Sequence, residues 1–246
     1  MQAIGKVIEI WRYPVSSITG EQLASAESFE RGLIGDRNFG LVEVETGIPA
    51  RPEQDARWHR ALDLKARSSA DGLAEIQFPG GPWQSVITPG LSDELTRFFG
   101  FPVDLRPYEN RNLLPGHPGP WAVGRYEPSA LHLLTTASLD RLKALHPEGN
   151  TDRRRFRPNL LLEMPEIEGE FPETTWMDRK LVVGSVRMTV SRPTRRCGFT
   201  VIAQNGVPED PQILRNIVRQ NSRNLGVYCS FEQHGSFSVG DTVYFA

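Results

Sequence analysis

The 246-residue sequence predicts a mainly β protein with flanking helices, of the α+β class. Short apolar runs punctuated by Gly and Pro turns fill the first third, and such spacing is typical of β-barrels and sandwiches. Two later segments instead repeat apolar residues at helical spacing after a capping residue. Hydrophobic residues make up 39% of the chain, enough for one large or two modest domains.

The first third contains strand patterns and one short helix. Three segments are rich in β-forming residues and end at turn residues, and they are predicted strands: 4–15, 38–45 and 74–78. A helix is predicted over 92–99, where Ser92 can cap the first turn and Gly100 stops the last. The segment 107–128 is rich in Pro and Gly, and a loop of this length is usually a linker or functional.

This long segment gives the predicted division of the chain. We expect an N-terminal β domain, a barrel or a sandwich, over 1–106, a connecting loop over 107–128 and a second domain over 129–246. The second domain has four predicted strand regions: 131–134, 159–163, the hairpin 180–191 that turns at Gly184-Ser185, and the closing pair 225–231 and 242–245.

Two helices are predicted in the second domain. The first follows the capping run 135–138 and carries one apolar face: Leu139, Leu142 and Leu145. The second begins at Asp210 and Pro211, an N-cap and a first-turn proline. Its apolar stripe consists of Ile213, Leu214, Ile217 and Val218.

Charge and composition exclude several classes of protein. The net charge of −2 and pI of about 6.2 argue against a general nucleic-acid binder. No apolar run reaches the length of a membrane span, and the N-terminus lacks the apolar stretch of a signal peptide. Two distant cysteines fit a reducing compartment. We therefore expect a cytoplasmic protein with no nucleic-acid or membrane partner.

Cys197 is the most informative single residue. The only other cysteine is Cys229, so thiols alone cannot build a zinc site. Arg195 and Arg196 precede Cys197, and fixed positive charge favours a thiolate. A thiolate is either a nucleophile or a soft metal ligand. Cys229 lies in a predicted strand, where a buried structural thiol is expected.

Clustered arginines indicate a discrete anionic ligand. One cluster is Arg153, Arg154, Arg155 and Arg157, and the other is Arg192, Arg195 and Arg196. The alternative for either cluster is a solvated basic face. Arg37 follows a turn with two glycines and could bind an anion or form a surface pair with Asp36. His132 lies in an apolar run, where a core histidine is expected. Motifs of common hydrolases, zinc enzymes, kinases and dinucleotide-binding proteins are absent from the sequence.

Six short motifs occur in a telling order: Tyr13-Pro14-Val15-Ser16-Ser17, Gly32-Leu33-Ile34-Gly35-Asp36-Arg37, Thr135-Thr136-Ala137-Ser138-Leu139, Arg155-Phe156-Arg157-Pro158-Asn159, Arg196-Cys197 and Val239-Gly240-Asp241. With them the chain resembles the MOSC family, named for the C-terminal domain of molybdenum-cofactor sulfurase. It is similar above all to members with an N-terminal MOSC β-barrel domain, such as the mitochondrial amidoxime-reducing component. The resemblance covers nearly the whole chain.

The resemblance implies a fold and a cofactor. It implies a MOSC-type β-barrel preceded by a smaller N-terminal β-barrel-like domain, and binding of the molybdenum cofactor, a pyranopterin dithiolene that ends in phosphate. Cys197 would ligate molybdenum as the catalytic residue. The residues implied to hold phosphate and pterin are Ser17, Arg37, Thr136, Ser138, Arg157 and Asn159, and we add Arg196. Two departures are Ser16, where the family often has Lys, and the altered sequence 202–206 after the cysteine.

The implied function is reduction of N-hydroxylated or N-oxide compounds by a molybdenum oxidoreductase. No flavin, haem, iron–sulfur or pyridoxal-phosphate motif is visible in the sequence, so electrons would come from a separate donor, either ferredoxin-like or a flavin reductase. One alternative is a carrier that binds the cofactor, or sulfur as a Cys197 persulfide, without turnover. A second alternative is a metal-free anion-binding module lined by arginines.

Overall fold

The computed structural model describes residues 1–29, 31–69, 72–108, 119–124, 129–165 and 170–246. The chain forms two compact units. The first contains Met1–Trp11, Gln22–Ile34 and Ser129–Ala246, and the second contains Arg12–Glu21 and Gly35–Pro128. This grouping differs from the predicted division, because the N-terminal strand belongs with the C-terminal half. Most of the predicted connecting loop lies outside the described residues.

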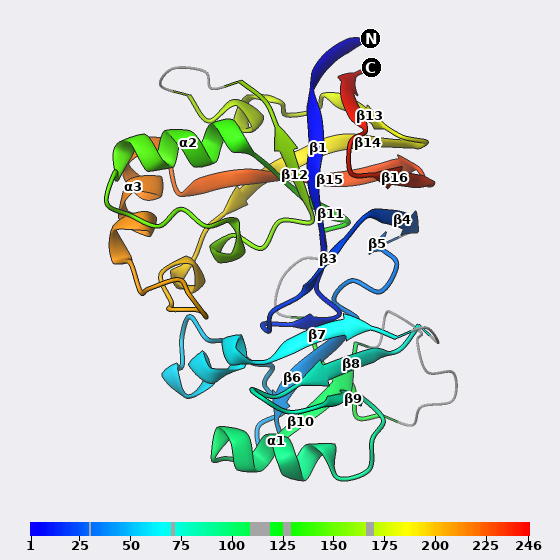
Figure 1. The fold of residues 1–246 in the computed structure, drawn as a ribbon, viewed down its shortest axis with the longest axis vertical. Helices are drawn as coiled ribbons and strands as arrows, with labels where there is room; N and C mark the ends of the chain where they lie inside the picture. The colour runs from blue at the N-terminus through cyan, green and yellow to red at the C-terminus, as the bar shows by residue number, and fades with distance from the viewer. Residues whose placement is uncertain (30, 70–71, 109–118, 125–128, 166–169) are drawn as a thin grey trace. The chain divides into compact units, whose positions relative to one another are not determined.

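The first unit is built on a closed seven-stranded barrel (Figure 1). Its strands, in order around the barrel, are β12 (Leu160–Glu163), β11 (Leu131–Thr135), β15 (Asn224–Gln233), β14 (Val186–Arg195), β13 (Lys180–Val183), β17 (Thr242–Phe245) and β1 (Gln2–Arg12). The strand β1 closes the ring, since Ile10 pairs with Leu160 of β12 and Lys6 pairs with Thr242 of β17. The short strand β3 (Glu21–Leu23) extends the sheet beside β1. The prediction of a mainly β fold is confirmed.

Apolar residues of alternating strand positions fill the barrel. Val7, Met188 and Val227 are fully buried in one hydrophobic core with Leu131 and Leu133. Every residue of β11 is buried, because that strand is covered on both faces. Burial of each such side chain contributes about 1.5–3 kcal/mol, so the barrel interior is the main stabilising element of this unit.

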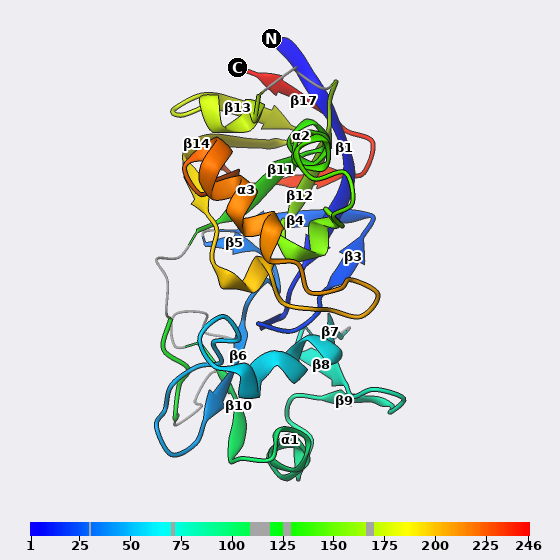
Figure 2. The same cartoon turned by 90° about the vertical axis from the view of Figure 1, so that its left-hand side faces the viewer.

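Two helices cover the outside of the barrel, α2 (Thr136–Leu145) and α3 (Pro211–Asn221), and they lie side by side in both cartoon views (Figures 1 and 2). Leu142 and Ile213 pack with Leu134 of β11 in a second core. The predicted caps are confirmed, because Thr135 and Asp210 accept hydrogen bonds from the first-turn amides of α2 and α3.

The predicted apolar stripe of the second helix is too wide. Ile213 and Ile217 are buried, but Val218 is 46% exposed. The predicted face of the first helix is confirmed, with Leu142 buried and Leu139 and Leu145 packed against the same core.

Smaller elements complete the first unit. Three 3-10 turns are described there: η3 (Arg153–Arg155), η4 (Pro172–Thr175) and η5 (Gly198–Thr200). A separate three-stranded sheet pairs β16 (Ser236–Ser238), β4 (Ser25–Phe29) and β5 (Gly32–Leu33) in that order. No strand was predicted between 231 and 242, but β16 lies there, because β4 supplies a pairing partner from the other end of the chain.

The second unit has its own core between two three-stranded sheets. One sheet pairs β10 (Val103–Pro107), β6 (Phe39–Glu43) and β2 (Val15–Ser16), and the other pairs β7 (Lys65–Ser68), β8 (Ala74–Gln77) and β9 (Trp83–Ser85). The helices are η1 (Ala56–Asp63) and α1 (Leu91–Phe99). Trp58 lies at the centre, with its ring 5.1 Å from that of Phe99 and 4.9 Å from that of Phe101.

The start of α1 differs from its prediction. The N-cap is Gly90, in the left-handed conformation with φ of 86°, and the Glu94 amide donates to the Gly90 carbonyl. Ser92 does not cap the helix, because its hydroxyl donates to Asp104 at 2.7 Å. Gly100 ends the helix as predicted, also in the left-handed conformation.

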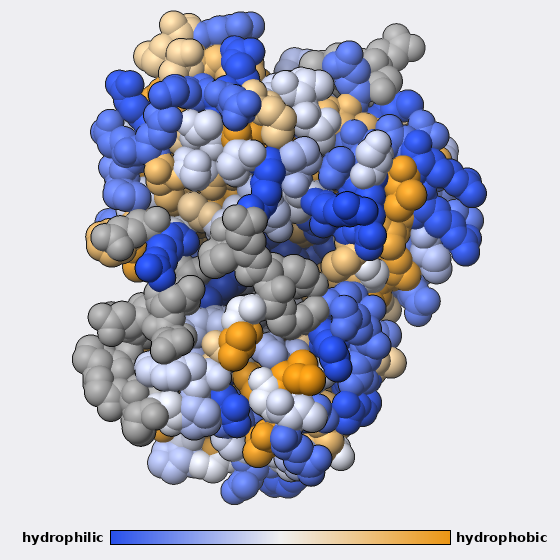
Figure 3. All heavy atoms as spheres, turned by 180° about the vertical axis from the view of Figure 1, so that it is seen from behind, coloured by the Kyte–Doolittle hydropathy of each residue, from blue (hydrophilic) through white to orange (hydrophobic). Residues whose placement is uncertain are grey.

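The surface in Figure 3 is mostly hydrophilic, with small groups of hydrophobic side chains among charged ones. Exposed large apolar residues of the described chain include Phe29, Ile87 and Val123. Scattered apolar residues are usual on protein surfaces. No helix in the described ranges has the length and hydropathy needed to cross a bilayer.

Candidate cofactor site around Cys197

Cys197 follows β14 and is the N-cap residue of η5. Its side chain is partly exposed, whereas Cys229 is completely buried in the barrel core. Burial raises the pKa of Cys229 to about 12, which keeps that thiol protonated and confirms the prediction of a structural cysteine. Cys197 is therefore the thiol that a ligand can reach.

The backbone on both sides of Cys197 is fixed by hydrogen bonds. The amide of Arg196 donates to the carbonyl of Arg223 at 2.8 Å, and the Arg223 Nε donates back to the Arg196 carbonyl at 2.6 Å. On the other side, the Thr200 amide and hydroxyl both donate to the Cys197 carbonyl, at 3.1 and 3.0 Å. The thiol thus stands on a short, tightly held segment.

Two predicted cofactor residues adjoin this segment. Arg196 donates from Nη2 to the Phe156 carbonyl at 2.8 Å, and its guanidinium lies 5.4 Å from the Phe156 ring centre. The Arg157 guanidinium lies 5.6 Å from the ring of Phe199, two residues after the cysteine. The structure therefore brings Arg157 and Arg196 together with Cys197. Their role in cofactor binding stays a prediction.

Several of the predicted cofactor residues have an unusual backbone conformation. Six described non-glycine residues have positive φ: Ser17, Arg37, Arg157, Asp178, Ser222 and Arg223. Such conformations cost about 1–3 kcal/mol each and cluster at ligand-binding sites. Three of the six are predicted cofactor residues, and Arg223 contacts the segment of Cys197. Arg223 was missed from the sequence, since only the folded backbone brings it to Arg196.

Asn159 is a bridge between strands. Its side chain is buried; Nδ2 donates to the Trp11 carbonyl at 3.1 Å and Oδ1 accepts from the His132 amide at 3.2 Å. His132 is also buried, and its Nδ1 lies 3.2 Å from the Arg157 carbonyl. The prediction of a core histidine is confirmed. Asn159 joins β1 to β11 beside Arg157, and its predicted pterin contact stays a prediction.

Thr136 and Ser138 lie away from Arg157 and Asn159. Strands β11 and β12 run parallel, with Leu133 beside Leu160, so residues after β11 and residues before β12 lie at opposite ends of the pair. Thr136 exchanges hydrogen bonds with Met164, beyond the end of β12. The geometry therefore does not support placing Thr136 and Ser138 at the cofactor beside Arg157. Ser129, just before β11, lies at the Arg157 end of this strand pair.

Ser138 instead contacts a buried carboxylate that sequence reasoning also missed. Glu173 is fully buried and accepts hydrogen bonds from Ser138 at 2.5 Å, from Thr135 at 2.7 Å and from the Gly226 amide at 3.0 Å. Burial raises the pKa of Glu173, an effect that these hydrogen bonds oppose. This carboxyl ties the start of α2 to β15.

Ser17 and Arg37 belong to the second unit. The Ser17 hydroxyl donates to the Ala50 carbonyl at 3.4 Å. Arg37 forms the ion pair with Asp36 that the sequence suggested as one alternative, and its guanidinium lies 4.9 Å from the ring of Tyr13. Asp36 is buried and accepts from the Tyr13 amide at 2.8 Å. A part for Ser17 and Arg37 in cofactor binding stays a prediction.

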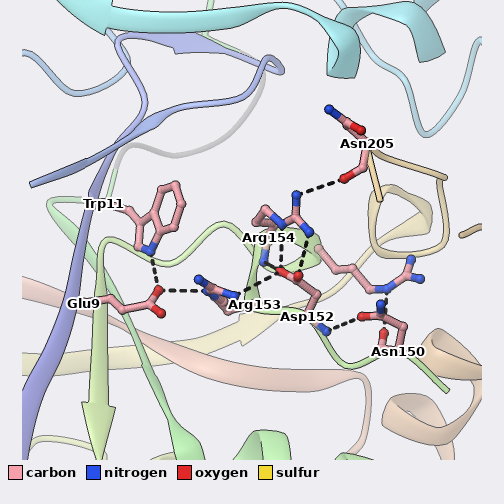
Figure 4. A network of polar contacts seen from close by, with 8 residues as sticks. Glu9, Trp11, Asn150, Asp152, Arg153, Arg154 and Asn205 are labelled. Carbon is pink, nitrogen blue, oxygen red and sulfur yellow. Dashed lines mark hydrogen bonds and ion pairs between the residues drawn. The ribbon is translucent and has the colours of Figure 1, made fainter. Parts of the chain in front are cut away.

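Arg153 and Arg154 form ion pairs within the chain (Figure 4). Arg153 pairs with Glu9 at 2.8 Å, and Arg154 pairs with Asp152 at 2.8 Å and donates to the Asn205 carbonyl at 2.9 Å. Burial raises the pKa of Asp152, but the hydrogen bonds from Arg154 hold this pKa below its ordinary value. The guanidinium groups of Arg153, Arg154 and Arg155 thus donate to acceptors within the chain, and Arg157 is the member of the cluster for which anion binding stays a prediction.

The donor set fits a cofactor that brings its own metal ligands. In the described part of the chain, no group of three or more His, Cys, Asp or Glu side chains could hold a metal ion. Of the two thiols, Cys197 is the accessible one, with the cations of Arg157 and Arg196 nearby. One thiolate suits a metal already chelated by sulfur, and guanidinium groups suit a phosphate.

Comparison with known proteins decides the family, since residues 119–244 match the model of the MOSC domain. The chain belongs to the MOSC family. It is 26% identical to mitochondrial amidoxime reducing component 2 of Macaca fascicularis and 25% identical to components 2 and 1 of Homo sapiens, with 99% of this chain and 84% of each relative aligned. The predicted cytoplasmic location stays a prediction.

A solved structure shares the MOSC fold described here. The crystal structure of the YuaD protein from Bacillus subtilis aligns over 99% of this chain and 94% of its own, with a TM-score of 0.51 and 11% identity. This likeness supports the barrel architecture alone, because identity at that level does not extend to function.

Proposed function

We propose that this MOSC protein binds molybdenum cofactor through Cys197 and reduces N-hydroxylated or N-oxide small molecules, with electrons from a separate donor protein. The observation that carries the proposal is the accessible Cys197 thiol held beside Arg157 and Arg196, while the second thiol is buried. MOSC membership and the similarity to amidoxime reducing components support a molybdenum-cofactor-associated function and an oxidoreductase-type role.

Individual residues would have distinct roles in cofactor binding. Cys197 would be the metal ligand, and Arg157 and Arg196 would contribute positive potential that favours an anionic cofactor. His132 and Asn159 would hold Arg157 in its left-handed conformation through the backbone around β11. When bound, the cofactor would supply two-electron oxygen-transfer chemistry. Reduction of an N-hydroxyl group consumes two electrons and two protons and releases water.

Metal analysis tests the proposal. The full chain, produced in a host that makes the cofactor, should contain molybdenum, and Cys197→Ala should lose it. Cys229→Ala is the matched control, because that thiol is buried and should leave the molybdenum content unchanged. Equal molybdenum in the wild type and Cys197→Ala would contradict the role of Cys197.

The alternative is a carrier of the cofactor, or of sulfur on Cys197, without turnover. The same accessible thiol favours it, since a persulfide needs a reachable sulfur. An assay of amidoxime reduction with a chemically reduced viologen as electron donor separates the two functions. Molybdenum-loaded protein that does not reduce the substrate would support the carrier and overturn the reductase.

A further inference from the structure

Arg155 is a completely buried arginine that binds three backbone carbonyls, two of which come from a distant part of the chain. Its Nε donates to Asn150 at 2.8 Å, its Nη1 donates to Thr200 at 3.1 Å and its Nη2 donates to Pro208. Burial lowers the pKa of Arg155, an effect that Asp210 and Asp152 oppose. A guanidinium is suited to this arrangement because its donors point in fixed, diverging directions.

Two of these carbonyls lie at the two ends of one loop, which we call the 200–208 loop. Gln204 and Val207 exchange backbone hydrogen bonds of 2.8 Å across a two-residue turn, in which Gly206 has φ of 73°. By binding Thr200 and Pro208, Arg155 fastens the base of the loop. Arg154 donates a hydrogen bond to its tip, at the Asn205 carbonyl (Figure 4).

The base of the loop is continuous with the segment of Cys197. Thr200 is fully buried, and its hydroxyl and amide donate to the Cys197 carbonyl. We propose that Arg155 is a positioning residue for the Cys197 thiol, acting through Thr200. Arg155 fixes Thr200, Thr200 fixes the carbonyl of Cys197, and the partly exposed sulfur is held in one orientation. The inference rests on the proposed function in that Cys197 serves as the metal ligand.

The two cysteines make the inference testable in one molecule. Alkylation of Cys197 in the native protein reports the accessibility and order of its segment, while alkylation of Cys229 reports unfolding of the barrel core. A purely structural role for Arg155 would expose both thiols together. A positioning role changes Cys197 and leaves Cys229 protected.

The experiment uses the full chain made in a host that lacks cofactor synthesis, treated with iodoacetamide and analysed by peptide mass spectrometry. In Arg155→Met, Cys197 should be alkylated at least about fivefold faster than in the wild type, because the buried hydrogen bonds donated by Arg155 are lost. Cys229 should stay unmodified. Arg154→Met is the matched control and should remain within about twofold of the wild type, since Arg154 holds only the tip of the loop.

Thr200 provides a second pair of variants that does not depend on the folding of Arg155→Met. Thr200→Val keeps the shape and loses the hydroxyl, so it should also accelerate Cys197 alkylation, whereas Thr200→Ser should behave as the wild type. Equal Cys197 rates in Thr200→Val and Thr200→Ser, or Cys229 alkylation rising in parallel with Cys197 in Arg155→Met, would overturn the inference. Molybdenum content plays no part in this readout, so failure here is distinct from failure of the proposed function.

Discussion

The imidazole of His132 and the backbone carbonyl of Arg157 lie 3.2 Å apart, which links a buried strand residue to a residue in the left-handed conformation. The ring nitrogen Nδ1 must carry the hydrogen, because a carbonyl oxygen only accepts. Part of the energy that stabilises the unfavourable φ of Arg157 therefore comes from the core of the barrel.

His132→Phe tests this link. The phenyl ring fills the space but cannot donate to the Arg157 carbonyl, so we expect a loss of about 1–3 kcal/mol in unfolding free energy. Urea unfolding followed by tryptophan fluorescence measures it. His146→Phe is a control of the same chemistry at a partly exposed position. A loss for His132→Phe no larger than for the control would contradict the link.

Gly226 should be intolerant of a side chain for two reasons. Its φ is 78°, and an added Cβ would lie 2.4 Å from the His132 Nε2 and 2.8 Å from the Leu133 carbonyl. Gly226→Ala should therefore lower the melting temperature more than Gly206→Ala. Gly206 has the same sign of φ but has nothing within 4 Å of an added Cβ, so its substitution costs only the backbone strain of about 1 kcal/mol. Equal shifts would show that the close contact is relieved at no cost.

Glu173 should make stability depend on pH in an unusual direction. Burial raises its folded pKa above the unfolded value of about 4.3, so the folded state binds more protons in that interval. Its contribution is full below the unfolded pKa and is lost as pH rises to the folded pKa. Urea unfolding at a series of pH values should show Glu173→Gln gaining on the wild type as pH rises. Parallel curves for the two proteins would contradict the raised pKa.

The two thiols should differ in their reaction with a thiol reagent. Because the pKa of Cys229 is raised to about 12 and the side chain is buried, a thiol reagent at neutral pH should label one cysteine in the native protein and two in guanidinium chloride. Mass spectrometry should place the native label on Cys197. Native labelling of Cys229 would mean that the barrel opens on the timescale of the reaction.

Local chemistry was predictable from the sequence. Thr135 and Asp210 cap helices because short polar side chains before an apolar period can satisfy free amides, and this rule needs no tertiary information. The different fates of Cys197 and Cys229 followed in the same way, since one neighbours arginines and the other lies in an apolar strand.

Relationships between distant segments were not predictable. Nothing near Thr136 indicates that β11 and β12 are parallel neighbours. The family resemblance assigned Thr136 and Arg157 to one cofactor, whereas the two residues lie at opposite ends of the strand pair. The cluster that contains Arg155 was predicted either to bind an anion or to form a solvated face. Only the fold shows that the carbonyls of Thr200 and Pro208 converge on Arg155.

The position of β1 between β12 and β17 has a consequence for biosynthesis. Strand β1 precedes β12 by more than half of the sequence and β17 by nearly all of it, so neither edge of β1 has its barrel partner until well over half of the sequence has been made. Contacts between such distant positions form slowly. Chains under synthesis should therefore expose β1 without its barrel neighbours, and a chaperone that shields β1 would be expected to raise the yield of folded protein.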